Sequence, residues 1–236
     1  MAYRSTAPHP RVSAASPSLS FGELDAAAQG QTLWAIGGFP ASPKDDLPPE
    51  TRTVILLAPR EPCFWAHVQS APEFADQAPD PLDRWSRRAV EGLAETVGGF
   101  ALFPFDGPPW QPFIRWAERT GRIHQAPTGL LVHAEAGLWV SLRGALALPY
   151  AVGVPGPLRR ACNDCTDRPC LSACPVGALT PEGYDVGACR EYVRTAAGAA
   201  CREAGCLVRR ACPVSARYPR VPAQSAFHMR AFARAP

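Results

Sequence analysis

The sequence predicts an α+β protein of two parts, a sheet-centred domain over residues 20–150 and a small cysteine-rich domain over residues 157–218. Strand-like and helix-like segments alternate through the first range, which is typical of layers built around a sheet. Proline and glycine interrupt this pattern at residues 149–157, which indicates a domain boundary. Eight of the nine cysteines then follow between positions 162 and 212.

Composition restricts the class of protein. With 47% hydrophobic and 19% charged residues, a folded globular chain is expected. The net charge of +3 is too mild to indicate nucleic-acid binding by itself. No apolar run approaches the roughly 20 residues of a membrane span, and the start of the chain lacks the apolar core of a secretory signal. We therefore expect a cytoplasmic protein without a membrane partner, in which cysteines are metal ligands or catalysts rather than disulfides.

The two ends of the chain differ in character. Residues 1–19 are small, polar and proline-containing, so a mobile arm is expected there. Residues 219–236 form a C-terminal tail in which His228 lies among aromatic residues. A packing helix is the preferred interpretation of that segment, over a tail that folds back across a site.

The clearest local patterns lie in the middle of the first domain. Residues 53–59, TVILLAP, are a short apolar run that predicts a buried strand. Residues 80–99 predict a helix with Asp80 as the N-cap, Pro81 at the first position and a stop at Gly98. Its apolar positions share one face of the helix, and they are Leu82, Trp85, Ala89 and Leu93.

Further elements follow this helix. Residues 100–105 are a second strand candidate, and residues 108–121 predict a helix that starts at prolines and stops at Gly121. Residues 129–148 predict two strands around a turn at 134–137, and therefore a hairpin.

The cysteines of the second domain occur in two runs of four, and each run ends in Cys-Pro. In order they are Cys162, Cys165, Cys170, Cys174, Cys189, Cys201, Cys206 and Cys212. Cubane iron-sulfur clusters take four thiolates each, and in two-cluster ferredoxins the cysteine before proline ligates the other run's cluster. This crossed arrangement assigns Cys162, Cys165, Cys170 and Cys212 to one [4Fe-4S] cluster, and Cys174, Cys189, Cys201 and Cys206 to the other. The sequence thus predicts a ferredoxin-like domain that transfers electrons.

Two points remain open at these cysteines. Two four-cysteine zinc sites could use the same residues, although paired Cys-Pro endings are typical of iron-sulfur proteins. Arg168 and Pro169 lengthen the gap between Cys165 and Cys170, and the gaps of the second run are longer too. These longer gaps make the assignment of Cys201 and Cys206 to one cluster the least certain part of the arrangement. Five arginines flank the cysteines and either tune cluster potentials or are ordinary surface residues. They are Arg159, Arg160, Arg168, Arg209 and Arg210.

Two resemblances add to this interpretation. The segment CREYVRT, followed by the second cysteine run, resembles the cluster domain of epoxyqueuosine reductases and corrinoid reductive dehalogenases, with Cys189 matching their isolated cysteine. The segments DPLDRWSRRAVEGLAE and AGLWVSLRGALALP are similar to cobalamin-processing proteins of the CblC type. The second resemblance implies a nitroreductase-like front domain that binds a corrinoid such as cobalamin, with FMN as the second choice.

Four residues are candidates for the pocket that such a cofactor would need. Pro109 and Trp110, preceded by Pro108, form a stiff aromatic loop that could line a flat macrocycle or simply pack. Trp139 and Arg143 would share one face of a strand, where Arg143 could meet a propionamide or a phosphate. A core tryptophan beside a surface arginine is an equal alternative.

Two further residues favour structural roles. His133 alternates into an apolar strand and is expected to be a core histidine. Cys63, away from the other cysteines, is expected to be a buried inert thiol. No catalytic residue is assigned.

Three functions are compatible with these features. The first is an iron-sulfur oxidoreductase that takes electrons from a redox donor protein and passes them to a small-molecule cofactor or substrate, most plausibly a corrinoid. The second is a non-enzymatic electron carrier or cobalamin-trafficking module. The third is a tRNA-modifying reductase of the epoxyqueuosine type, against which the mild charge and the lack of a helical-repeat region after the cysteines both argue.

Overall fold

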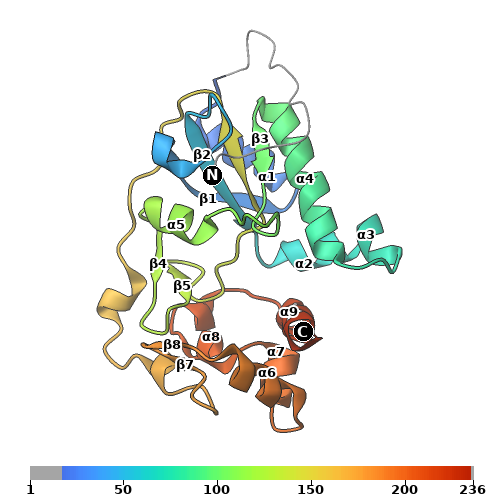
Figure 1. Ribbon diagram of the computed structural model, residues 1–236, viewed down its shortest axis with the longest axis vertical. Helices are drawn as coiled ribbons and strands as arrows, with labels where there is room; N and C mark the ends of the chain where they lie inside the picture. The colour runs from blue at the N-terminus through green and yellow to red at the C-terminus, as the bar shows by residue number, and fades with distance from the viewer. Residues whose placement is uncertain (1–17, 235–236) are drawn as a thin grey trace. The chain divides into compact units, whose positions relative to one another are not determined.

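The structure is a computed structural model that describes residues 18–234 (Figure 1). Apart from its last two residues, the expected arm at 1–19 lies outside the described residues. The chain divides into two compact units. The first unit comprises the chain up to Thr120 together with Ser141–Gly156, and the second comprises Gly121–Val140 together with the chain from Pro157 onward.

The first unit is built on a four-stranded antiparallel sheet in the order β1-β2-β6-β3 (Figure 1). Its strands are β1 (Leu33–Pro40), β2 (Thr53–Pro59), β3 (Phe100–Leu102) and β6 (Gly144–Leu148). Every residue of β2 and β6 is buried, because these are the two central strands and both of their faces are covered. The apolar run at 53–59 is therefore the buried strand that the sequence predicts.

Helices of the first unit precede and follow these strands. They are α1 (Phe21–Gln29), α2 (Cys63–Gln69), α3 (Pro72–Ala75), α4 (Pro81–Val97) and α5 (Phe113–Arg119), with a short 3-10 turn at Pro43–Asp45. Ser20 and Glu23 form a reciprocal capping box at the start of α1. The predicted helix α4 is confirmed, and its four apolar positions are buried. Asp80 precedes it in the left-handed region, at φ 51°, but its side chain makes no capping hydrogen bond.

Two predicted elements begin or end elsewhere. The helix expected over 108–121 starts only at Phe113, since residues before prolines such as Pro109 and Pro112 are biased away from the helical region. The strand expected over 100–105 ends at Leu102.

The hairpin predicted over 129–148 is confirmed only at its turn, where His133 and Gly137 form an isolated antiparallel bridge, and its two strands have other partners. Strand β5 (Leu131–His133) pairs with β4 (Ile123–Gln125) in the second unit, whereas β6 pairs with β2 and β3 in the first. Periodicity correctly indicated two strands but carries no information on their partners. The chain instead leaves the second unit after Val140 and enters the central strand of the first.

The second unit consists of short elements. They are β4, β5, β7 (Leu179–Thr180), β8 (Gly183–Tyr184), α6 (Val186–Arg194), α7 (Ala199–Ala204), α8 (Leu207–Ala211) and α9 (Pro222–Arg234). Three single 3-10 turns lie at Ala161–Asp164, Pro169–Leu171 and Ser215–Arg217. Helix α9 packs against α6 and α7 within the tail predicted at 219–236.

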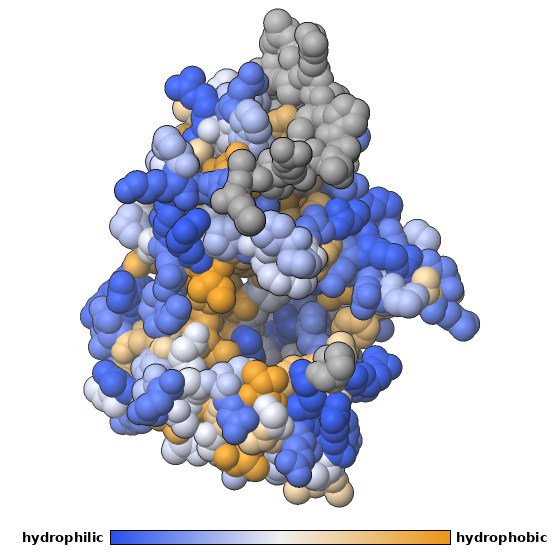
Figure 2. Space-filling model, in the orientation of Figure 1, coloured by the Kyte–Doolittle hydropathy of each residue, from blue (hydrophilic) through white to orange (hydrophobic). Residues whose placement is uncertain are grey.

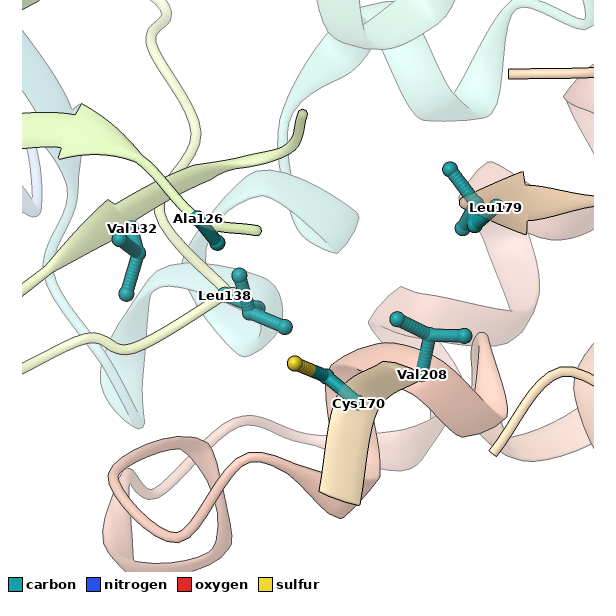
Figure 3. Close-up of a cluster of buried hydrophobic side chains, with 6 residues drawn as sticks. All are labelled: Ala126, Val132, Leu138, Cys170, Leu179 and Val208. Carbon is teal, nitrogen blue, oxygen red and sulfur yellow. The ribbon is translucent and has the colours of Figure 1, made fainter. Parts of the chain in front are cut away.

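Residues 121–140 belong to the second unit because their apolar side chains complete its core. Figure 3 shows this cluster, in which the Cys170 sulfur points toward Leu138. Its members are Ala126, Val132, Leu138, Cys170, Leu179 and Val208. Gly137 fixes the adjacent turn at φ 56°, where a Cβ would come within 2.5 Å of the Ser215 backbone nitrogen. Ser215 Oγ in turn accepts a hydrogen bond of 2.8 Å from Leu138 N–H.

The observed elements confirm the α+β fold class. Helices and small antiparallel sheets occur in both units. The nitroreductase-like and ferredoxin-like assignments of the two domains stay predictions. Figure 2 shows polar and apolar groups interspersed over the visible face of the described residues. None of the helices in residues 18–234 has both the length and the apolar character that crossing a bilayer requires.

Candidate metal centre

All eight cysteines of the two predicted clusters lie in the second unit as free thiols. Cys170 and Cys201 are buried, and the other six are half-buried. Seven of them lie within or at the end of a short helix or 3-10 turn, whereas Cys174 lies outside these elements. Cys206, for example, is the N-cap of α8 and Cys212 is its C-cap.

Four of these thiols form a first thiol set: Cys162, Cys165, Cys170 and Cys212. Burial raises the pKa of Cys162, and the neighbouring thiols Cys170, Cys212 and Cys165 raise it further. The pKa of Cys170 is raised by burial first and then by Cys165 and Cys212. A cavity of about 310 Å³ is lined by all four of these thiols and by apolar residues such as Val132 and Leu138.

The remaining four form a second thiol set: Cys174, Cys189, Cys201 and Cys206. Burial raises the pKa of Cys189, as do the nearby thiols Cys206, Cys174 and Cys201, while a hydrogen bond with Tyr184 opposes the rise. Burial also raises the pKa of Cys201, and Cys206 and Cys174 act in the same direction.

Cys212 lines the same cavity as Cys162, Cys165 and Cys170, and Cys174 is among the thiols that raise the pKa of Cys189 and Cys201. Within the described residues, no group of three or more His, Cys, Asp or Glu side chains has the arrangement of a metal-ion site. The role of the eight thiols as metal ligands therefore stays a prediction.

Polar groups lie near the sulfurs of the second thiol set. Ala178 N–H donates a hydrogen bond to Cys174 Sγ at 3.2 Å. The backbone of Leu207 opposes the rise in the pKa of Cys201, and the Tyr184 hydroxyl opposes that of Cys189. Sequence reasoning missed Tyr184, because a tyrosine five positions before a cysteine matches no motif, and its contact depends on the turn between β8 and α6.

Arginines near the thiols differ in their surroundings. Arg209 is half-buried, donates a hydrogen bond to the Leu138 carbonyl, and lies near Cys206 and Tyr184. Burial lowers the pKa of Arg209. Arg168, by contrast, is exposed near the first thiol set, and the exposed Arg159 forms an ion pair with Asp164.

The expected cofactor-binding residues divide between the two units. Pro109 and Trp110 are exposed in the first unit, with 64% of Trp110 accessible. Arg143 is paired with Asp83 at 3.3 Å, also in the first unit. Trp139 lies in the second unit, where the Arg220 guanidinium stands 5.6 Å from its ring centroid.

The expectation that Trp139 and Arg143 share a strand face is therefore wrong. Neither residue is in a strand, because the chain passes from one unit to the other between them. Whether the four candidates bind a cofactor stays a prediction.

His133 and His228, the two histidines that the sequence singled out, both pack within the second unit. His133 is buried, as its alternation predicts, and its Nδ1 accepts a hydrogen bond of 3.2 Å from Glu135 N–H. Burial, followed by the charges of Arg122 and His124, lowers the pKa of His133 to about 4. His228 is half-buried in α9, with its ring edge-on to Phe227.

Cys63 is not the buried thiol that was expected. It is exposed at the start of α2, where its thiol donates to the Arg60 carbonyl at 3.3 Å. Its apolar neighbours in sequence, Phe64 and Trp65, face the core instead, since successive residues of a helix point in different directions.

Comparison with known proteins gives a likeness of fold. No family model matches the chain, and no curated protein matches its sequence. A selenomethionine-labelled epoxyqueuosine reductase matches with a TM-score of 0.55 and 16% identity, over 87% of this chain and 68% of the other. The epoxyqueuosine reductase of Streptococcus thermophilus matches with a TM-score of 0.49 and 15% identity, over 84% of this chain and 67% of the other.

The first of these likenesses supports the resemblance to epoxyqueuosine reductases and establishes similarity of fold alone. It does not show the link to CblC-type proteins or to reductive dehalogenases, and the corrinoid role expected from them has no support in these matches.

Proposed function

We propose that this chain is an iron-sulfur oxidoreductase whose second unit holds two [4Fe-4S] clusters. The observation that carries the proposal is that eight free thiols lie in the second unit and that Cys212, from the second run, lines one cavity together with Cys162, Cys165 and Cys170. Each set supplies the four cysteine ligands that one cubane cluster takes.

The surroundings of the thiols fit these groups. The first thiol set lines a cavity whose other walls include the apolar residues Val132, Leu138 and Pro213 together with charged residues such as Arg160 and Asp164. Burial favours the neutral thiol at Cys170 and Cys201, so thiolates there require compensation by a bound cation. When bound, each cluster would supply one-electron transfer.

We further propose that the reaction is a reduction of the epoxyqueuosine type, the reduction of an epoxide on a tRNA nucleoside. The fold likeness to an epoxyqueuosine reductase supports an epoxide on tRNA as the electron acceptor. It gives no such support to a corrinoid, which the CblC resemblance implies.

Reduction of an epoxide to an alkene consumes two electrons and two protons and releases the oxygen as water. Two one-electron centres could deliver the electrons from a donor protein. A net charge of +3 is too small for tight, nonspecific binding of the RNA backbone. We therefore propose that the protein contacts mainly the modified nucleoside.

Cluster content is the first test. Protein purified without oxygen is expected to contain about eight iron and about eight sulfide per chain. Cys212→Ala is expected to lose the cluster of the first thiol set, and Cys201→Ala that of the second, so each variant retains about half of the iron. Cys63→Ala, which removes an exposed thiol of the first unit, is the matched control and should retain all of it. Stoichiometric zinc without sulfide would overturn the assignment.

Turnover is the second test. The reduced protein is incubated anaerobically with tRNA that carries epoxyqueuosine, with and without added cobalamin, and the nucleosides are measured after digestion. Loss of the epoxide supports the proposed reaction, and a requirement for cobalamin together with a changed cobalamin spectrum supports the corrinoid prediction. Full cluster content without conversion would leave an electron carrier and refute the proposed substrate.

A further inference from the structure

We propose that a pocket of the second unit binds the phosphate group of a small organic phosphate ester. The pocket has a volume of about 710 Å³, and all the residues that line it belong to the second unit. The polar side chains on which the proposal rests are Arg160, Arg168, His124, Gln125 and Asn163. The inference goes beyond the proposed function, because it concerns side chains other than the thiols.

The lining of this pocket is positively charged. Two arginines line it, and none of the described aspartates or glutamates does. Neither Arg160 nor Arg168 takes part in an ion pair within residues 18–234. The nearby carboxylate of Asp164 is paired with Arg159 instead. The pocket therefore presents two positive charges that an anion would neutralise.

Arg168 reaches the pocket from the long gap between Cys165 and Cys170. This gap holds four residues and is longer than in the common bacterial ferredoxin motif. Arg168 lies in the left-handed region at φ 41°, directly before Pro169, and residues with a side chain rarely adopt this conformation before proline. Strained backbone of this kind is frequent at ligand sites. The added residues thus place a guanidinium in the pocket, which cluster binding alone does not require.

Side chains from two further segments supply hydrogen-bonding groups to the pocket. His124 and Gln125 belong to strand β4, and Asn163 lies in the 3-10 turn at Ala161–Asp164. The Nε2 atom of His124 is buried and has no hydrogen-bond partner in the described part of the chain. Burial, followed by the charge of Arg160, lowers the pKa of His124, so its imidazole is neutral at pH 7 and can donate from Nε2. A ligand oxygen would satisfy this atom.

A phosphate ester matches these groups in charge and in shape. It carries a charge of about −1.5 to −2 at pH 7 and has oxygens that accept strong hydrogen bonds. Guanidinium groups bind phosphate through paired, parallel N–H···O bonds. The volume of about 710 Å³ lies within the roughly 300 to 1,000 Å³ of small-molecule pockets, and Ala126 and Pro127 add apolar walls. The pocket therefore has room for the organic part of a ligand as well as for its phosphate.

The test is isothermal titration calorimetry of the full-length, anaerobically purified protein with ribose 5-phosphate. Cys162 and Cys165 also line the pocket, so the affinity is measured with whatever group these thiols hold. Inorganic phosphate, ribose and succinate are the comparison ligands, which lack the organic part, the charge and the phosphate, respectively. Ribose 5-phosphate is expected to bind several-fold more tightly than any of them. Absence of binding, or equal affinity for inorganic phosphate or succinate, would overturn the inference.

Arg168→Asn tests the guanidinium, because asparagine tolerates the left-handed region and keeps the backbone in place. Loss of its charge-assisted hydrogen bonds is expected to weaken the binding of ribose 5-phosphate about tenfold or more. Arg230→Gln is the matched control, since it removes the same charge from an exposed position of α9 in the second unit. Unchanged affinity in Arg168→Asn, or an equal loss in Arg230→Gln, would contradict the proposal.

Two further measurements cover an Arg168 variant that fails to fold. His124→Ala lies on β4 and flanks no cysteine, and it is expected to weaken binding several-fold. In the unmodified protein, ribose 5-phosphate is expected to slow backbone hydrogen exchange in residues 123–127 and 160–168. Full affinity in His124→Ala, or protection confined to other segments, would refute the inference.

Iron and sulfide are measured on the same samples, which separates this inference from the proposed function. Protein that contains both clusters but does not bind ribose 5-phosphate refutes the inference and leaves the proposed function intact. Protein that binds the ligand but lacks iron and sulfide refutes the proposed function and leaves the inference intact.

Discussion

The two units of this chain build their cores by different means. In the first unit, β2 and β6 are buried along their whole length, and large apolar side chains such as Trp85 and Trp116 are fully buried beside them. In the second unit, the apolar cluster of six residues already includes Cys170, and four more cysteines pack against it. They are Cys162, Cys174, Cys206 and Cys212.

This difference indicates which interactions stabilise each unit. A sheet with apolar faces gains its stability from burial and from paired backbone groups, and needs no other component. Short elements around thiols bury less apolar surface, and metal binding supplies folding free energy in such domains. If its thiols hold the proposed clusters, the second unit should therefore depend on them, whereas the first unit should not.

The largest expected effect is selective loss of structure when the proposed clusters are removed. After oxidation and chelation of iron, backbone hydrogen exchange in α6, α7 and α8 should rise to near the rate of an unfolded chain, because these helices carry or flank the thiols. Strands β2 and β6 should keep their protection. Mass spectrometry of peptides from the full-length chain measures both, and equal loss in the two units would contradict the comparison.

The sequence specified the local elements of the first unit well. The run at 53–59 and the helix from Pro81 depend on neighbouring residues alone, namely an uninterrupted apolar stretch and a start and stop signal. The partner of β6 depends on strands far away in sequence, so no local pattern distinguished a central strand from half of a hairpin. The same limit hid the transfer of residues 121–140 to the second unit.

The same distinction between local signals and long-range contacts applies to the candidate metal centre. Cysteine spacing and the two Cys-Pro endings suggested two sets of four thiols, since ligand type and count are written in the sequence. Tyr184 and Arg209 carry no such signature, because their contacts arise from a turn and from packing. Arg143 was a candidate either to face a ligand or to lie at the surface, and no sequence signal indicated its partner Asp83, which comes from α4, sixty positions earlier in the chain.

A core truncation in the first unit should have the next largest effect. Leu56 is fully buried in β2, so Leu56→Ala should lower the free energy of unfolding of the first unit by about 3 kcal/mol. Ile114→Ala is the matched control, since 58% of Ile114 is exposed and its truncation should cost less than about 0.5 kcal/mol. Denaturant titration gives both values. Loss of iron from Leu56→Ala while the first unit stays folded would show that the units are not independent.

Acid should destabilise the second unit through His133. The pKa of this buried histidine is lowered to about 4, and it lies near about 6.5 in an unfolded chain. The unfolded state therefore binds the proton first, and stability falls as the pH drops from about 6.5 toward about 4. Between pH 7 and pH 5, the loss attributable to His133 should be about 2 kcal/mol.

Hydrogen exchange of β4 and β5 in the wild type and in His133→Gln measures this loss. Because any acid lability of the clusters acts on both proteins, the difference between their pH dependences isolates His133. The same pH dependence in both proteins would show that His133 does not cause the loss of stability.

The smallest effect should come from a surface ion pair of the first unit. The side-chain hydrogen bond from Arg88 lowers the pKa of Glu73, whose carboxylate is 10% exposed while the Arg88 side chain is 53% exposed. Since the folded pKa lies below the unfolded value, the pair stabilises the fold above about pH 4.5 and is lost as the pH falls through the lowered pKa. Arg88→Gln should lower the free energy of unfolding at pH 7 by less than about 1 kcal/mol, because the arginine remains accessible to water. The deficit should disappear at acid pH in a denaturant titration of the first unit. A deficit that persists unchanged at acid pH would instead assign the contribution of Arg88 to packing of its aliphatic stem.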